Sequence, residues 1–260
     1  MTTGSINSIR DGIVAVITLN RPEDFNSFDE TMMQALTGAL SDARDDDSVR
    51  GVVLTGEGRA FCAGGNLKYV SGHERGAEYA FRLVAGAFHQ AVTEIHRMKK
   101  PVVAAVNGPA AGGGFSLAMA ADFRVMANSA VLKLGYLSAG LCIDGGGTYT
   151  LPRLVGAARA MEIAALDEPI EAQKARDLGL VTMVVDTDRV VAEAVALAKR
   201  VGSGPLFAFG AIKGLFADAY ENPFETQLER EQGLIARSGA HPEGREGMAA
   251  FVEKRKPKFS

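Results

Sequence analysis

The sequence predicts an α/β core followed by a helical C-terminal region. Three observations support this fold class. Short apolar runs of strand length alternate with longer segments of helical periodicity up to about residue 200. Helical patterns then follow one another, with breaks at 202–205, 222–223 and 241–242. No short repeat or low-complexity linker divides the chain, so we expect residues 1–200 to form the core and residues 201–260 a helical appendage.

The N-terminal segment is expected to form a hairpin and a helix. Residues 6–10 and 12–19 alternate apolar and polar side chains around an Asp-Gly pair, as in a β-hairpin. Ser27 and Glu30 have the spacing of a capping box. The helix that should follow carries an apolar stripe at Met33, Leu36, Leu40 and Ala43.

The central segment is expected to supply buried strands and further helices. The predicted strands are continuous apolar runs at 49–55, 102–106, 123–127 and 181–185, with a shorter run at 130–133. Residues 74–98 have the pattern of a long helix. A second helical face is formed by Ala160, Ile163, Ala164 and Leu166.

Two glycine-rich turns are the strongest candidates for a functional site. Gly112, Gly113 and Gly114 follow a strand and open a small-residue helix, and Gly64-Gly65 follows the strand at 49–55. Glycines let the backbone approach a ligand closely, and the free amides of a first helical turn favour an anion. Two such donors aimed at one oxygen would form an oxyanion hole. This predicts chemistry through an enolate or a tetrahedral intermediate.

Other sites fit the sequence less well. No Lys-Ser/Thr pair follows either glycine turn, which excludes a P-loop, and Phe61 and Thr150 interrupt the dinucleotide-binding pattern. Ser116, Asp144 and His241 occur in the order of a serine hydrolase, but Ser116 lies ten residues past the strand instead of on a tight elbow.

Composition and residue spacing reduce the number of function classes that fit the sequence. The net charge of −3 gives no basic field for nucleic acid. The four histidines lack ligand spacing with cysteines or carboxylates, so we expect no metal. Cys62 and Cys142 form no disulfide framework and are expected to be packed thiols in a cytoplasmic protein. Residues 101–121 could span a membrane by length, but their glycines, proline and asparagine favour a buried strand–turn–helix.

Across nearly its whole length the chain resembles the crotonase, or enoyl-CoA hydratase/isomerase, superfamily. The segments that carry this resemblance are NRPEDFNSFD, GRAFCAGGNLK, KPVVAAVNGPAAGGGFSLAMAADFRV, GLCIDGGGTYTLPRLVGAARA and EGREGMAAFVEKRKPKF. The resemblance implies an α/β fold built as a crotonase-like spiral of ββα units, with a helical C-terminal trimerisation region. It also implies trimers that often pair into hexamers, and an acyl-CoA thioester as substrate, without a separate cofactor.

The resemblance assigns roles to individual residues. The amides of Gly65 and Gly113 would hold the thioester oxygen. The adenosine part of coenzyme A would lie near Asn26, Ala63, Asn66 and Leu67. The region of Lys254, from a neighbouring subunit, would reach the phosphates.

The chain departs from the hydratase pattern at two positions. Hydratases of the superfamily use two glutamates to hold and activate water, and this chain has Ser116 and Tyr136 there. Neither side chain ionises readily near neutral pH, so the usual water clamp cannot form.

Asp144 remains as a candidate acid/base. It lies where several isomerases of the superfamily carry an aspartate, including dienoyl-CoA isomerases and ring isomerases of phenylacetate breakdown. A single carboxylate can remove a proton from one carbon and return it to another. The competing interpretation is that Asp144 caps the helix expected after it.

The sequence therefore predicts an enzyme that moves a double bond in an enoyl-CoA thioester. Three alternatives remain. A hydratase could position water through Asp144 or through groups of the substrate, a non-catalytic chain could bind the thioester without turnover, and a decarboxylase could use Tyr136 to orient a carboxylate.

Overall fold

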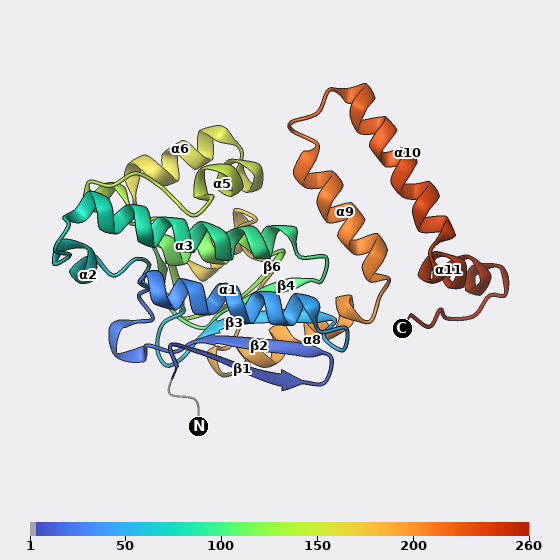
Figure 1. Cartoon of the computed structure of the whole chain (residues 1–260), viewed down its shortest axis with the longest axis horizontal. Coiled ribbons are helices and arrows are strands. Elements are labelled where there is room, and N and C mark those ends of the chain that lie inside the picture. Colours follow the sequence, from blue (N-terminus) through green and yellow to red (C-terminus); the bar gives the residue numbers. More distant parts are fainter. Residues whose placement is uncertain (1–3, 260) are drawn as a thin grey trace.

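The core of the molecule is a twisted sheet of six strands. The computed structural model describes residues 4–259. The strands lie in the order β1 (Ile6–Asp11), β2 (Val14–Leu19), β3 (Gly51–Gly56), β4 (Val102–Val106), β6 (Phe123–Ala127) and β9 (Met183–Val185). β1 and β2 pair antiparallel, and every later pair is parallel (Figure 1). The predicted hairpin and the strands of the sheet are thus confirmed.

Helices cover both faces of this sheet. On one face α1 (Glu30–Asp45) packs on β1 and β2 and lies along α3 (Ala77–Arg97), while α8 (Val190–Gly202) covers β3, β4 and β6 on the other (Figure 1). β3 and β4 are buried along their whole length. Burial on both faces explains why these strands are continuous apolar runs.

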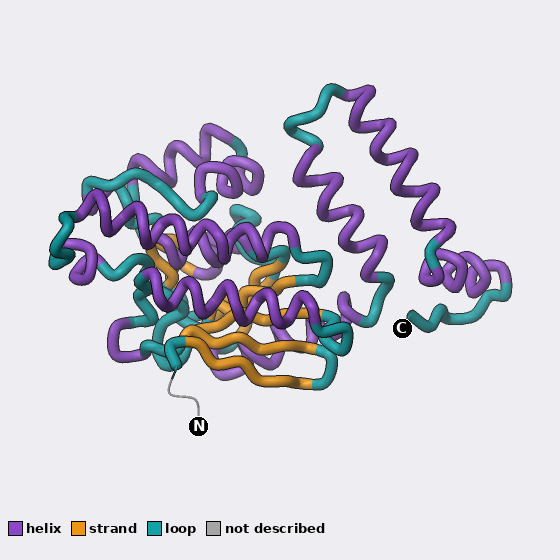
Figure 2. The backbone as a smooth tube through the Cα atoms, in the orientation of Figure 1, coloured by secondary structure: helices purple, strands orange, loops and turns teal. Residues whose placement is uncertain are grey.

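A smaller sheet and four helices surround one end of the core. Its strands are β5 (Ala110–Ala111), β7 (Val131–Lys133) and β8 (Ile170–Glu171). The helices are α4 (Gly113–Ala120), α5 (Gly147–Val155), α6 (Ala157–Leu166) and α7 (Ala172–Asp177). Figure 2 shows how helices and loops dominate this end. β5 and β8 were not predicted, because two residues carry no periodic signal.

Two helix starts differ from the predictions. α1 is capped by Asp29, whose carboxylate accepts from the Met32 amide at 2.9 Å, so the predicted capping box from Ser27 is wrong. The helix expected from residue 74 begins at Ala77, after the short helix α2 (Leu67–Ser71) and Gly76. Gly76 has φ 83°, a left-handed conformation that cannot continue a helix.

After α8 the chain leaves the core as an arm. The arm consists of α9 (Leu206–Asp218), α10 (Phe224–Ala240) and α11 (Pro242–Val252), which project to one side (Figures 1 and 2). Its base is held by Arg50, whose guanidinium donates to the carbonyls of Gly202 and Gly204 at 2.8 and 2.9 Å. No helix within residues 4–259 is both long and apolar enough to cross a membrane.

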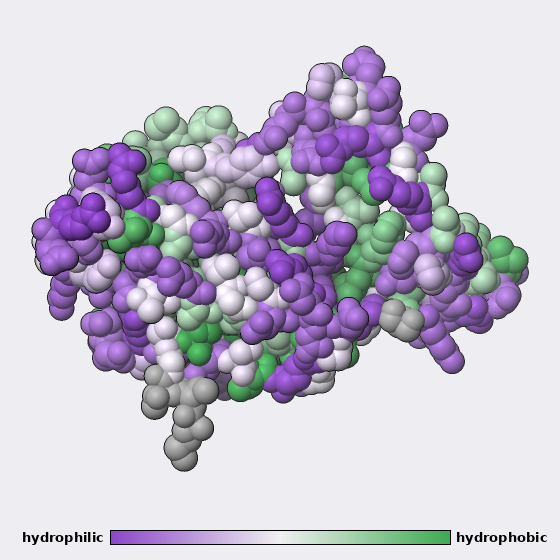
Figure 3. Space-filling view, viewed as in Figure 1, coloured by the Kyte–Doolittle hydropathy of each residue, from purple (hydrophilic) through white to green (hydrophobic). Residues whose placement is uncertain are grey.

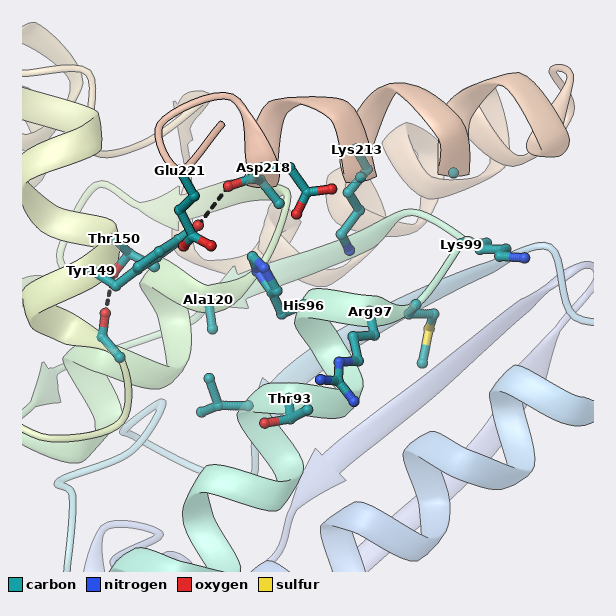
Figure 4. Close-up of a pocket in the computed structure, with 16 residues that line it drawn as sticks. Thr93, His96, Arg97, Lys99, Ala120, Tyr149, Thr150, Lys213, Asp218 and Glu221 are labelled. Atoms are coloured by element: carbon teal, nitrogen blue, oxygen red, sulfur yellow. Dashed lines mark hydrogen bonds between the residues drawn. The ribbon is translucent and has the colours of Figure 1, made fainter. Parts of the chain in front are cut away.

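A cavity of about 560 Å³ separates α9 from α3 and α5. Figure 4 shows Lys213 extending from α9 towards the end of α3 that carries His96. The Lys213 ammonium pairs with Asp122 at 2.8 Å and donates to the Ile95 carbonyl at 2.7 Å. Burial raises the pKa of Asp122, and the charge of Lys213 opposes that shift. This buried ion pair fixes α9 to the core.

Helix α4 packs so closely on the segment before Gly64-Gly65 that no side chain fits at Gly114. A Cβ there would lie 2.0 Å from the Cys62 carbonyl oxygen. We expect Gly114→Ala to destabilise the fold by about 1–3 kcal/mol, because backbone must move to admit the methyl group. In the matched control Gly86→Ala, on α3, none of the described residues lies within 4 Å of the new Cβ. That variant should gain about 0.5–1 kcal/mol. Urea unfolding measures both, and equal stabilities would contradict this description of the packing.

Candidate active site

The two glycine turns meet at the start of α4. Cys62 forms a parallel bridge with Ala110, and the Ala111 amide donates to the Cys62 carbonyl at 2.9 Å. Gly64 has φ 91°, and a Cβ there would lie 2.8 Å from the Gly113 nitrogen. The glycine at position 64 therefore lets the first turn contact the second directly.

The amides of Gly65 and Gly113 are unpaired. Neither donates a hydrogen bond to any residue within 4–259. Gly113 opens α4, so its amide belongs to the first helical turn, where the macrodipole favours negative charge. Phe28 packs against Gly113, where a Cβ would lie 2.5 Å from its Cζ. The site thus offers two amide donors on adjoining turns.

Three polar side chains that the sequence singled out form a hydrogen-bonded chain. The Ser116 hydroxyl lies 3.1 Å from that of Tyr136, which donates to Asp144 Oδ1 at 2.6 Å. Ser116 belongs to α4, whereas Tyr136 and Asp144 lie in the segment between β7 and α5. Burial raises the pKa of Tyr136 and the charge of Asp144 raises it further, so Tyr136 stays a protonated donor.

Asp144 does not cap α5. The residue before α5 is Gly146, and within the described part of the chain no side chain makes a capping hydrogen bond there. Only the backbone carbonyl of Asp144 contacts the helix start, accepting from the Gly147 amide at 3.1 Å. The capping interpretation is therefore wrong, and the Asp144 carboxylate is engaged by Tyr136 instead.

The turn after Asp144 rests on α3. The Gly145 amide donates to His89 Nε2 at 3.2 Å, a contact that needs Nε2 unprotonated. A Cβ at Gly145 would lie 2.1 Å from Cε1 of Phe88. The sequence does not reveal this role of His89, because 56 residues separate the partners and no local pattern joins them.

Asp167 anchors the segment that carries Tyr136. Its two carboxylate oxygens accept from the amides of Gly135 at 2.6 Å and Ser138 at 2.9 Å. Burial works against the charged form, but the hydrogen bonds from Ser138 and Gly135 outweigh it and lower the pKa of Asp167. The residues flanking Tyr136 are thereby fixed.

Asp167→Ala is expected to lower the free energy of unfolding by about 1–3 kcal/mol at neutral pH, because two partly buried amides lose a charged acceptor. The folded pKa of Asp167 is lowered, so its contribution is present above the unfolded pKa, near about 3.9, and is lost as pH falls through the folded value. Urea unfolding at neutral and acid pH should show the deficit shrinking in acid. Glu168→Ala, at an exposed neighbour, is the control. A deficit independent of pH would contradict the charged role.

Comparison with known proteins identifies the family. The family model for enoyl-CoA hydratase/isomerase matches residues 10–260. The chain belongs to this family. A 1,2-epoxyphenylacetyl-CoA isomerase of Escherichia coli K12 is 37% identical over 248 residues, covering 95% of each chain. A probable enoyl-CoA hydratase of Rhodobacter capsulatus is 40% identical over 252 residues, covering 97% of this chain and 96% of that protein.

A solved structure gives the same fold. The crystal structure of an enoyl-CoA hydratase from Polaromonas sp. JS666 superimposes with a TM-score of 0.94 at 38% identity, covering 99% of this chain and 100% of that one. The predicted crotonase-like fold is confirmed.

Asn26, predicted near the adenosine of coenzyme A, has a structural role. Asn26 is fully buried; its side chain accepts from the Arg21 amide and donates to the carbonyls of Glu57 and Ala60 at 2.9, 2.9 and 2.8 Å, respectively. The side chain thereby clamps two loops together, and the placement of coenzyme A near it stays a prediction. Asparagine tolerates its left-handed φ of 57°.

The other residues predicted near coenzyme A occupy different surroundings. Ala63 and Leu67 are exposed on either side of Gly65. The Asn66 carboxamide caps α2 by accepting from the Tyr69 amide at 3.0 Å. Lys254 follows α11 in the arm, and α11 lies at the opposite end of the molecule from α2 in Figure 1. Within one chain Lys254 is therefore not part of the site.

Two alternative nucleophiles are ruled out by their surroundings. Burial raises the pKa of the Cys62 thiol to about 12, and its S–H donates to the Asn26 carbonyl at 3.2 Å. Cys62 is thus a packed thiol, as expected, whereas Cys142 is exposed, so the prediction of a packed thiol is wrong there. His241 stacks on Phe207 in the arm, with ring centroids 4.3 Å apart, and its ring accepts from the Glu243 amide. Within the described residues the Ser116 hydroxyl bonds only to Tyr136, so no serine-hydrolase triad forms.

Proposed function

We propose that this member of the enoyl-CoA hydratase/isomerase family moves a double bond in an enoyl-CoA thioester. The observation that carries the proposal is a single carboxylate, Asp144, in a site whose hydratase-type positions hold the neutral hydroxyls of Ser116 and Tyr136. The relatives include both an epoxyphenylacetyl-CoA isomerase and a probable enoyl-CoA hydratase, so the choice of an isomerase rests on the side chains of the site.

In this mechanism the thioester oxygen accepts hydrogen bonds from the amides of Gly65 and Gly113. Asp144 removes a proton from C2 of a 3-enoyl-CoA, and the electrons move into a dienolate whose oxygen the two amides stabilise. The protonated Asp144 then delivers the proton to C4, which yields the 2-enoyl-CoA and restores the carboxylate. No atom is gained or lost overall.

Hydration requires a different arrangement of groups. A water molecule must be held and deprotonated while a proton is delivered to the substrate, and hydratases use two carboxylates for this. Tyr136 and Ser116 are buried hydroxyls that bond to each other. They can orient a polar group but cannot share the acid and base work with Asp144 at neutral pH.

The proposal is tested by offering the enzyme a 3-enoyl-CoA and, separately, a 2-enoyl-CoA. Mass spectrometry with chromatography distinguishes an isomer of unchanged mass from a product heavier by one water. We expect rapid interconversion of the two enoyl-CoA isomers. Dominant formation of 3-hydroxyacyl-CoA would show a hydratase instead. Saturable binding without any product would show a thioester-binding protein.

We further propose that the arm mediates assembly into trimers, or hexamers of paired trimers. Its helices expose large apolar side chains, among them Phe216 at 73% and Phe251 at 86% exposure. Apolar residues also lie in the groove between arm and core in Figure 3. Exposed apolar area on this scale is typical of protein interfaces.

Sedimentation equilibrium tests this assembly. We expect a mass three or six times that of the 27.4 kDa chain, and a shift towards monomer for Phe216→Asp. The control Asp188→Ala, at an exposed position on the core, should leave the mass unchanged. A monomeric wild-type protein would contradict the proposal, along with the placement of Lys254 near coenzyme A of a neighbouring subunit.

A further inference from the structure

The oxygens of Asp144 differ in their surroundings. Oδ1 accepts from the Tyr136 hydroxyl at 2.6 Å, whereas Oδ2 has no hydrogen-bond partner within residues 4–259. We infer that Tyr136 is a positioning residue that holds Oδ1, so that Oδ2 alone carries the substrate proton from one carbon to the other. This inference rests on the isomerase function proposed above.

The direction of the hydrogen bonds follows from their chemistry. An ionised carboxylate only accepts, so the single proton of the Tyr136 hydroxyl points to Asp144. The Tyr136 oxygen can then accept from Ser116, which gives a chain running from Ser116 through Tyr136 to Asp144. Burial keeps Tyr136 protonated by raising its pKa, so Tyr136 directs Asp144 without taking part in the proton transfer itself.

The hydrogen-bonded chain is held in place at Ser116 and at Tyr136. Ser116 is fully buried in α4, and Tyr136 is only 7% exposed. The amides on either side of Tyr136, those of Gly135 and Ser138, are fixed by Asp167. A phenol in such a setting restrains rotation of the carboxyl group that it contacts.

This restraint has a chemical consequence. After Oδ2 takes the proton from C2, the carboxyl group keeps its orientation while Tyr136 still donates to Oδ1. The same proton can then pass to C4 before water replaces it. Without the Tyr136 hydroxyl the carboxyl group can rotate, which misplaces the proton and exposes it to exchange.

The test uses a 3-enoyl-CoA deuterated at C2, with Tyr136→Phe beside the wild type. We expect the wild type to pass a measurable share of deuterium to C4, and Tyr136→Phe to lose this internal transfer. Its kcat should fall up to about 10²-fold, as expected for a misplaced catalytic group, with a much smaller change in KM. Tyr220→Phe, at an exposed tyrosine of the arm, is the matched control.

A double-mutant cycle separates positioning from a general structural role. In the Asp144→Asn background, Tyr136→Phe should cause little further loss of rate, because its effect passes through the carboxylate. Thermal unfolding of each variant checks the fold. Equal losses in both backgrounds, or a Tyr136→Phe enzyme with wild-type rate and internal transfer, would overturn the inference. A wild-type protein that moves no double bond would overturn the proposed function instead.

Discussion

Asp144→Asn is expected to lower the rate of double-bond migration by about 10²–10⁴-fold, the range that a positioned acid/base contributes. Asparagine has nearly the same shape and its carbonyl oxygen can still accept from the Tyr136 hydroxyl, but the amide cannot take a proton from carbon. Binding of a saturated acyl-CoA should therefore change little, which calorimetry measures beside the kinetics.

Asp188→Asn serves as the control for this prediction, since Asp188 is exposed in the segment before α8. Its rate should equal that of the wild type. If Asp144→Asn retained full activity on a 3-enoyl-CoA, another group would be the base, and the assignment of Asp144 would be wrong.

Gly65→Pro is expected to lower kcat by about 10²–10³-fold, the cost of removing one oxyanion donor. Proline lacks the amide hydrogen that would bond to the thioester oxygen. Gly65→Ala is the matched control, because it keeps the amide and no atom of residues 4–259 lies within 4 Å of the added Cβ. Alanine should therefore cost far less than proline.

Comparing kcat of the two Gly65 variants separates the loss of the amide hydrogen from the effect of the added side-chain atoms. Circular dichroism and thermal unfolding establish that both variants fold. Similar rates for the proline and alanine variants would contradict an oxyanion hole at Gly65.

Local signals were sufficient to predict the sheet and the glycine turns. β3 and β4 are continuous apolar runs because both faces are buried, and such runs are visible without knowledge of their partners. Likewise, Gly64 and Gly113 were predicted because a close backbone approach requires glycine, and the glycine itself is visible in the sequence.

Contacts between distant segments could not be predicted in this way. Asp167 lies about 30 residues from the amides it anchors, and His89 contacts Gly145 from a separate helix. Neither Asp167 nor His89 belongs to a motif, or has a spacing, that indicates its hydrogen-bond partner. The cap of α1 was misassigned because Ser27 and Asp29 both suit that role, and only the backbone geometry selects Asp29.

The resemblance selected Ser116, Tyr136 and Asp144 one by one, but not how they interact. Their hydrogen-bonded order depends on how α4 and the segment before α5 are placed by the small sheet. Asn26 shows the same limit. The resemblance places it near the adenosine of coenzyme A, but gives no sign that its side chain bonds to backbone groups of Arg21, Glu57 and Ala60.

The most direct test of the central claim is deuterium incorporation from heavy water into 3-enoyl-CoA and 2-enoyl-CoA, with wild type beside Asp144→Asn. With Asp144 as the base, the wild type should move the double bond and, over repeated turnovers, incorporate deuterium at C2 and C4, and the variant should lose both processes. Exchange that survives in Asp144→Asn would contradict a mechanism with Asp144 as its single base.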